Sequence, residues 1–138
     1  MAQAFTVSRE LVSPPDTVWE QLTDWDRAAE WLGVDSLRAE GPTAVGTALV
    51  FQARGKERRS EIVALEPGRS VTLRSRQGGV TADYTYGVEP AGTGSRATLT
   101  ADVRTSGLWA LLGPVIRAAI RKEDSGQLDA LERALAGR

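Results

Sequence analysis

The sequence SPPDTVWEQLTDWDRAAEWL, residues Ser13–Leu32, decides how the rest of this chain can fold. It carries three of the four tryptophans, Trp19, Trp25 and Trp31, which follow one another at intervals of six residues. Such crowding of the largest apolar side chains indicates either the closure of a core or the wall of a cavity that admits a guest. The remainder of the chain must supply the surface that these side chains cover.

Two short helices are predicted within this stretch. Pro14 suits a first helical turn, and Ser13 and Asp16 have the spacing of a capping box. An apolar stripe at helical spacing follows, formed by Val18, Trp19 and Leu22. A second short helix is expected to end at Leu32, because Gly33 is the residue type that terminates helices.

On both sides of the two helices the chain alternates between apolar and polar residues, as half-buried strands do. The turns between these segments are rich in glycine and proline, and they are short, so neighbouring strands should pair in antiparallel fashion. Seven strands are expected, over Phe5–Leu11, Ser36–Glu40, Leu49–Phe51, Glu61–Leu65, Ser70–Arg76, Val80–Glu89 and Arg96–Arg104. The resulting sheet has one apolar and one polar face.

A single long helix from Leu108 to about Ala136 is predicted to cover the apolar face. Its stripe consists of Leu112, Val115, Ile116, Ala119, Ile120, Leu128, Leu131 and Leu135. Pro114 is expected to kink this helix or to mark its start. An amphipathic membrane anchor is the alternative for the first half of this helix. A helix in the core is favoured, because a sheet with one apolar face must have that face covered. The sequence therefore predicts one α+β domain spanning residues 1–138.

Composition excludes several classes of function. The chain has no cysteine and no histidine, so thiolate chemistry, the usual general base and the commonest metal ligand are missing, and no metal or cofactor is expected. A net charge of −1 argues against nucleic acid, and the basic run Lys56–Arg59 is interpreted as a solvated hairpin tip. No apolar run reaches the ~20 residues of a membrane span, and no signal peptide is recognised, so a cytoplasmic protein is expected.

The order of the elements resembles the helix-grip fold, and the residues resemble the START-like (SRPBCC) superfamily of polyketide cyclase/dehydrase type. PPDTVWEQLTDWDRAAEWL is similar to the proline–proline–x–x–valine–tryptophan helix and the tryptophan–leucine turn of that family, and Gly92–Thr100 and Ser106–Leu135 are similar to its last strand and helix. The resemblance covers essentially the whole chain. It implies a curved seven-stranded sheet wrapped around a long helix, with a cavity between them for apolar or amphipathic molecules.

The inner faces of the predicted elements supply the residues expected to line such a cavity. They are Leu49, Phe51, Ile62, Leu73, Tyr84, Tyr86, Leu99, Ala101, Leu112, Ile116, Ala119 and Ile120, with Trp25 and Trp31 as a gate at the mouth. For each of these residues ordinary core packing is the alternative. The two tyrosines need partners for their hydroxyls and are the best polar handles for a guest.

Two charged residues are further candidates for polar handles. Arg9 shares a strand face with apolar residues, so it needs a carboxylate from the protein or from a ligand, unless a bulge turns it outward. Glu123 lies one turn beyond the apolar stripe, where a solvated helix face is the alternative. The resemblance implies an arginine and a tyrosine deep in the pocket of the family's cyclases. No arginine other than Arg9 is expected on an inner strand face, and this disfavours an enzyme.

The sequence thus predicts a protein that binds a hydrophobic or amphipathic small molecule, lipid-like or polyketide-like, with no catalytic residues of its own. One alternative is a polyketide cyclase or dehydratase. The chain also resembles an actinobacterial branch described as toxins of toxin–antitoxin pairs, which offers a second alternative that would act through the outer surface. A monomer or a homodimer is compatible with the pattern, because Val63 and Leu65 are candidates for an outer apolar patch.

Overall fold

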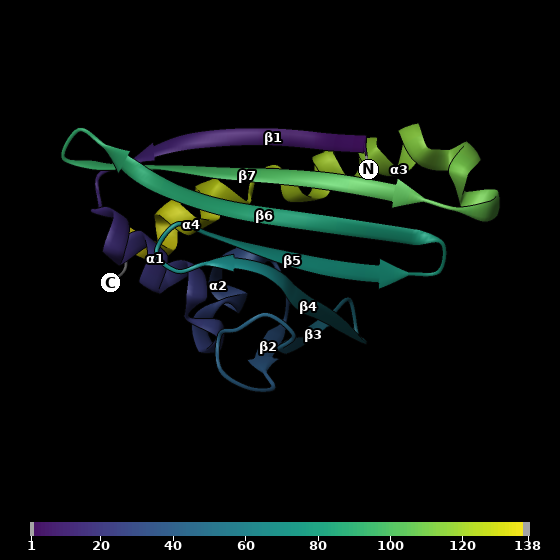
Figure 1. Ribbon diagram of the computed structural model, residues 1–138, viewed down its shortest axis with the longest axis horizontal. Coiled ribbons are helices and arrows are strands. Elements are labelled where there is room, and N and C mark those ends of the chain that lie inside the picture. Colours follow the sequence, from purple (N-terminus) through teal and green to yellow (C-terminus); the bar gives the residue numbers. More distant parts are fainter. Residues whose placement is uncertain (1, 137–138) are drawn as a thin grey trace.

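The computed structural model describes residues 2–136, apart from the side chains of Leu108 and Glu123. Over these residues, seven strands form one antiparallel sheet in the order β1-β7-β6-β5-β4-β3-β2 (Figure 1). The strands are β1 (Ala2–Leu11), β2 (Ser36–Ala39), β3 (Ala48–Ala53), β4 (Lys56–Glu66), β5 (Ser70–Gln77), β6 (Val80–Ala91) and β7 (Gly94–Thr105). The predicted helix-grip architecture of a sheet with short helices after its first strand and a helical C-terminal segment is confirmed.

The two faces of the sheet differ in polarity as the alternation predicts. On β7 the inward residues Ala97, Leu99, Ala101 and Val103 are all buried. The outer face carries cross-strand polar pairs, among them Thr72 with Thr85, whose hydroxyl oxygens lie 3.0 Å apart, and the ion pair of Arg74 with Asp83 at 2.7 Å. Such pairs stabilise a solvated sheet face without adding apolar surface to it.

Strand β4 differs from the prediction at both of its ends. It begins at Lys56, so the basic run belongs to the strand, and the hairpin tip is Arg54–Gly55, where both residues have positive φ. A shift of register between Ile62 and Ala64 marks a bulge, which leaves Ile62 buried and brings Leu65 against the core. Leu65 therefore does not join Val63 in an outer apolar patch.

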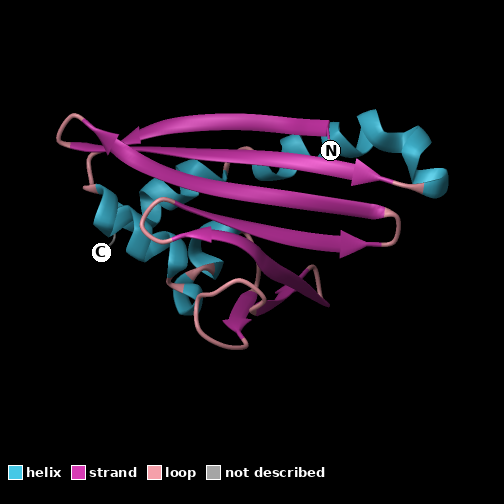
Figure 2. Ribbon diagram, in the orientation of Figure 1, coloured by secondary structure: helices cyan, strands magenta, loops and turns pink. Residues whose placement is uncertain are grey.

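Short helices lie at one end of the sheet: α1 (Pro15–Thr23), the 3-10 helix η1 (Trp25–Arg27) and α2 (Ala29–Leu32) (Figures 1 and 2). Gly33 ends α2 in the left-handed conformation, as predicted. The predicted capping box is wrong, because Pro14 is the N-cap and no side chain caps the helix. The Pro14 carbonyl accepts the amides of Thr17 and Val18, so the helix begins one residue later than the spacing of Ser13 suggests.

The C-terminal segment is divided into the 3-10 helix η2 (Gly107–Leu112), α3 (Gly113–Asp124) and α4 (Gln127–Ala136) instead of one continuous helix. Pro114 lies in the first turn of α3, and Gly126 separates α3 from α4. Helix α4 packs on α1, α2, β1 and β7, whereas α3 packs on β1, β7 and η2. These principal contacts leave the inner face of β3, β4 and β5 without a helix directly upon it.

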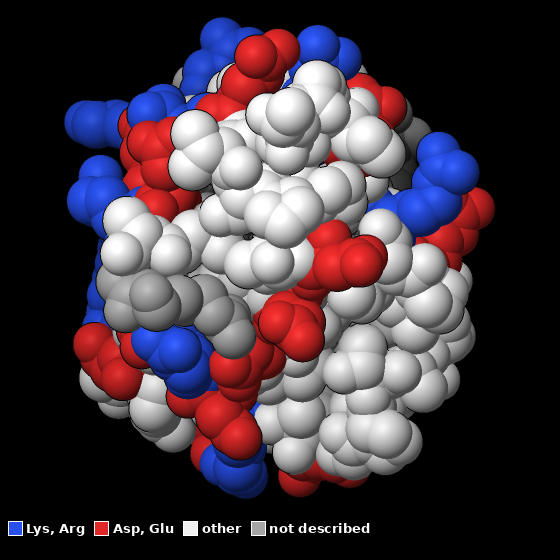
Figure 3. Space-filling model, turned by 90° about the vertical axis from the view of Figure 1, so that its left-hand side faces the viewer, with Lys and Arg blue, Asp and Glu red and all other residues white. Residues whose placement is uncertain are grey.

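The end of the molecule beside α1 is shown in space-filling form in Figure 3. Acidic and basic side chains occur together there, next to a broad area of uncharged residues. Among the described residues on this face, no extended area of basic side chains is visible. This face therefore carries charges of both signs.

Candidate functional site

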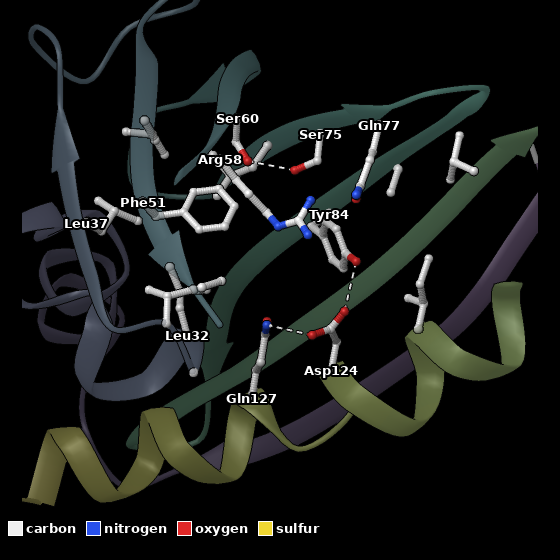
Figure 4. Close-up of a pocket in the computed structure, with 18 of the residues that line it drawn as sticks. Leu32, Leu37, Phe51, Arg58, Ser60, Ser75, Gln77, Tyr84, Asp124 and Gln127 are labelled. Carbon is white, nitrogen blue, oxygen red and sulfur yellow. Dashed lines mark hydrogen bonds between the residues drawn. The ribbon is translucent and has the colours of Figure 1, made fainter. Parts of the chain in front are cut away.

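A cavity of about 890 Å³ lies between the inner face of β3–β6 and the helices α3 and α4 (Figure 4). It occupies the part of the sheet that the C-terminal helices leave uncovered. Its volume falls in the range of about 300–1,000 Å³ that is usual for small-molecule sites. Its apolar wall is formed by Leu32, Val34, Leu37, Leu49, Phe51, Leu73, Val80, Ala82, Ile116 and Ile120.

Seven of the residues expected in a cavity line this one: Leu49, Phe51, Leu73, Tyr84, Tyr86, Ile116 and Ile120. They come from four elements, namely β3, β5, β6 and α3. Residues two apart on a strand share one face, as do Ile116 and Ile120, which are four apart on α3, so all seven side chains face the same cavity.

The two tryptophans expected at the mouth are core residues and do not line the cavity. Trp25 is buried, and its indole N–H donates to Thr43 Oγ1 at 2.9 Å. Trp31 packs edge-on against Tyr86, with 5.3 Å between the ring centroids. In their place, the cavity is lined by Leu32, the last residue of α2, and by Gly33 and Val34, which follow it. A sequence spacing cannot distinguish the two sides of so short a helix.

Five further candidates also lie outside the cavity wall. Ile62, Leu99 and Ala101 are fully buried in the core behind it. Ala119 is exposed because α3 turns Ile116 and Ile120 inward and presents its other side to solvent. Leu112 is exposed as well, and it lies in the 3-10 helix η2 before α3 begins.

Neither of the two charged candidates is a cavity residue. Arg9 points inward from β1 as expected, and the protein itself supplies its carboxylates: the guanidinium donates to Asp129 at 2.5 Å and to Glu132 at 2.7 Å, both on α4. The hydrogen bond from Arg9 holds the pKa of Glu132 below its usual value. The side chain of Glu123, the second candidate, lies outside the described residues.

A polar cluster at the junction of α3 and α4 closes one side of the cavity. The Tyr84 hydroxyl donates to Asp124 Oδ2 at 2.8 Å, and the Tyr86 hydroxyl donates to Gln127 Oε1 at 2.7 Å. The Gln127 amide in turn donates to Asp124 Oδ1 at 3.4 Å. Burial raises the pKa of Tyr86 well above its usual value, so its hydroxyl stays protonated and continues to donate.

The sequence interpretation of the basic run missed Arg58, which extends from β4 into the cavity (Figure 4). Arg58, Ser60 and Ile62 alternate along β4, so counting back by two from Ile62 would have placed the arginine on the inner face. Its neighbour Arg59 points outward and pairs with Glu40. Ser60 shares the wall with Ser75, and their hydroxyl oxygens lie 2.7 Å apart.

Trp109 is the tryptophan that does line the cavity, at a rim that is open to solvent. Its indole lies against the β5–β6 turn, where Gly78 has a φ of +59°. A Cβ added to Gly79 would lie 2.4 Å from Trp109 Cδ1 and 2.7 Å from the Ser106 carbonyl oxygen. The absence of a side chain at position 79 therefore allows the indole to sit at the rim.

The described residues contain neither a metal-binding cluster nor a membrane-spanning helix. Across residues 2–136, no group of three or more acidic, histidine or cysteine side chains is placed to hold a metal ion. No helix in the same part of the chain is long and apolar enough to cross a membrane.

Comparison with known proteins identifies the family. The family model for "Polyketide cyclase / dehydrase and lipid transport" matches residues 2–136. The chain therefore belongs to this family, and the START-like assignment made from the sequence is confirmed. A search of curated proteins finds no match.

Solved structures show the same fold. Protein MLL2253 from Mesorhizobium loti is 20% identical, with a TM-score of 0.76 over 96% of both chains. Ara h 8.0201 is 18% identical, with a TM-score of 0.71 over 97% of both chains. The di-domain ARO/CYC StfQ from the steffimycin biosynthetic pathway is 16% identical, with a TM-score of 0.72 over 97% of this chain and 51% of that chain.

Proposed function

We propose that the protein binds a hydrophobic or amphipathic small molecule in the cavity between the sheet and α3. The observation that carries the proposal is a cavity of about 890 Å³ with an apolar wall. Lipid transport is part of the family's description and supports the same function.

The energetics of such binding need no special polar group. A guest that buries about 300 Å² of apolar surface gains roughly 7 kcal/mol at 25 cal/mol per Å². The loss of translational and rotational freedom offsets part of this gain. Because 7 kcal/mol without any offset corresponds to a dissociation constant of roughly 10 μM, the wall alone supports an affinity between about 10 μM and 1 mM for an uncharged apolar molecule.

Native mass spectrometry of freshly purified protein, followed by titration calorimetry with 1-decanol, tests this function. We expect either an added mass that disappears on denaturation or binding of 1-decanol by the delipidated protein. Ile120→Trp places an indole in the cavity and should weaken 1-decanol binding at least tenfold. Ala119→Trp is the matched control, because Ala119 is the exposed neighbour on α3. Equal binding by both variants, or no binding by the wild type, would contradict the proposal.

A cyclase or dehydratase is the second candidate function, favoured by the presence of Asp124, Tyr84 and Arg58 in one cavity. Such an enzyme removes a proton beside a carbonyl group and stabilises the enolate that forms. Asp124 would accept the proton, and the cation of Arg58 would stabilise the enolate.

Turnover of a linear poly-β-ketone thioester, followed by chromatography, tests the second candidate. Asp124→Asn should abolish cyclised product and leave 1-decanol binding within about threefold of wild type. An equal rate of product formation with Asp124→Asn would exclude Asp124 as the base.

A further inference from the structure

We infer that the natural guest carries an acidic group, of which a carboxylate is the simplest form, and that Arg58 binds it. The inference rests on the proposed function and adds the chemical class of the ligand. It starts from Arg58, one of two arginines among the described residues that line a cavity with a largely apolar wall; the other, Arg54, lies in the β3–β4 turn. The Arg58 side chain lines the cavity and is half-buried.

Arg58 has no carboxylate partner within the described part of the chain. Arg9, the other arginine that points inward from a strand, is held by both Asp129 and Glu132. Arg59, its immediate neighbour, is paired with Glu40 on the outside of the sheet. The protein therefore supplies anions to Arg9 and Arg59 and, among the described residues, leaves the Arg58 guanidinium without one.

The acidic side chain on the opposite wall does not neutralise Arg58. Asp124 accepts hydrogen bonds from Tyr84 and Gln127, which hold it at the junction of α3 and α4. No ion pair joins it to Arg58 among residues 2–136. A guanidinium presents its N–H groups in a planar fork that matches a carboxylate, and partial burial strengthens such a charge-assisted pair.

Hydroxyl groups beside Arg58 extend the same chemistry. Ser60 and Ser75 share one hydrogen bond, so one of their two hydroxyl protons is left to donate elsewhere. Both residues line the cavity, Ser60 on the same strand β4 as Arg58 and Ser75 on the neighbouring strand β5. A cation and a hydroxyl donor on one wall are complementary to an anionic oxygen, while the apolar wall receives the rest of the molecule.

The test is titration calorimetry at pH 7.5 and low salt with two ligands of equal chain length, decanoate and 1-decanol. Wild type should bind decanoate more tightly than 1-decanol. Arg58→Gln should weaken decanoate binding about 10- to 100-fold and change 1-decanol binding less than about threefold. Arg59→Gln is the matched control and should leave both affinities unchanged. The same comparison is then made with 2-naphthoate and 2-naphthol. It shows whether the cavity prefers a flat aromatic acid or a fatty acid.

Each outcome decides between the two proposals. If wild type binds 1-decanol, but Arg58→Gln binds decanoate as tightly as wild type does, the inference of an acidic ligand is overturned and the proposed function stands. If neither ligand of either pair binds wild type, both are overturned. Should Arg58→Gln fail to fold, Arg58→Lys keeps the charge without the fork, and it should retain part of the preference for decanoate. A complete retention of that preference in Arg58→Lys would contradict a role for the planar fork, and a complete loss would contradict a role for the charge.

Discussion

The two helices at the C-terminus, α3 and α4, share an apolar periodicity but differ in what their apolar faces contact. In α4 the residues Leu128, Leu131 and Leu135 are buried against α1, α2 and the sheet. In α3 the inward residues Ile116 and Ile120 are only half-buried, because they face the cavity. Periodicity thus identifies residues that share a helix face, whereas the structure shows whether that face completes a core or borders a cavity.

The junction between these helices is held by the sheet. Asp124 is the last residue of α3 and Gln127 the first of α4, and Tyr84 and Tyr86 of β6 donate to them. Strand β6 thereby fixes both the end of α3, which borders the cavity, and the start of α4, which packs in the core. The following variants separate the contribution of α4 to the core from the contribution of α3 to the cavity.

Leu131→Ala should have the largest effect. Leu131 is fully buried in α4, and its truncation leaves a void in the core, so the free energy of unfolding should fall by about 2–5 kcal/mol. Urea unfolding followed by circular dichroism measures this loss. Val115→Ala on the exposed side of α3 is the control and should stay within about 0.5 kcal/mol of wild type. Similar losses for both variants would remove the distinction between α3 and α4.

Tyr86→Phe should cost about 1–2 kcal/mol in the same measurement. The ring and its packing on Trp31 are retained, while the buried hydroxyl and its bond to Gln127 are lost. Tyr84→Phe, at a less buried position of the same strand, should cost less. If Tyr86→Phe is as stable as wild type, the β6 hydroxyls do not hold the junction.

Ile116→Ala should change binding more than stability. Its side chain is half-buried at the cavity wall, so we expect a stability loss of about 1 kcal/mol or less and a three- to tenfold weaker affinity for 1-decanol. Calorimetry and urea unfolding together measure the two quantities. A stability loss as large as that of Leu131→Ala would show that α3 completes the core as α4 does.

Glu132→Gln should have the smallest effect, and that effect depends on pH. Arg9 lowers the pKa of Glu132 in the folded protein, so the ionised carboxylate contributes stability above its unfolded pKa of about 4.3. This contribution is lost as the pH falls through the lowered folded value. Thermal unfolding should therefore show a lower melting temperature for the variant at pH 7 and a smaller difference near pH 3. Glu20→Gln, an exposed position on α1, is the control, and a difference that grows at low pH would contradict the assignment.

Alternation predicted the sheet well because each strand has one solvated face. Period two placed Tyr84, Leu73 and Phe51 on the inner face of the sheet, and the family resemblance implied the cavity that they line. The same rule would have placed Arg58 there, but a run of four charged residues was interpreted as a turn before its period was counted. The prediction that a toxin-like surface carries the function stays untested by these observations.

Other parts of the site could not be predicted from local patterns. The end of α3 at Asp124 depends on a hydrogen bond from Tyr84 of β6, which lies 40 residues earlier in the sequence. The burial of Trp31 depends on α4, which packs on α2 only after the whole chain has folded. Contacts over such separations leave no periodic trace in the residues that make them.

The position of Trp109 gives the molecule an optical reporter for the cavity. Trp25 and Trp31 are 6% and 2% exposed, so their emission already reflects an apolar environment, whereas Trp109 is 45% exposed at the rim. A guest that reaches the rim displaces water from Trp109 while the two buried indoles keep their surroundings. Its arrival should therefore shift the emission spectrum to shorter wavelength, and Trp109→Phe should remove that shift.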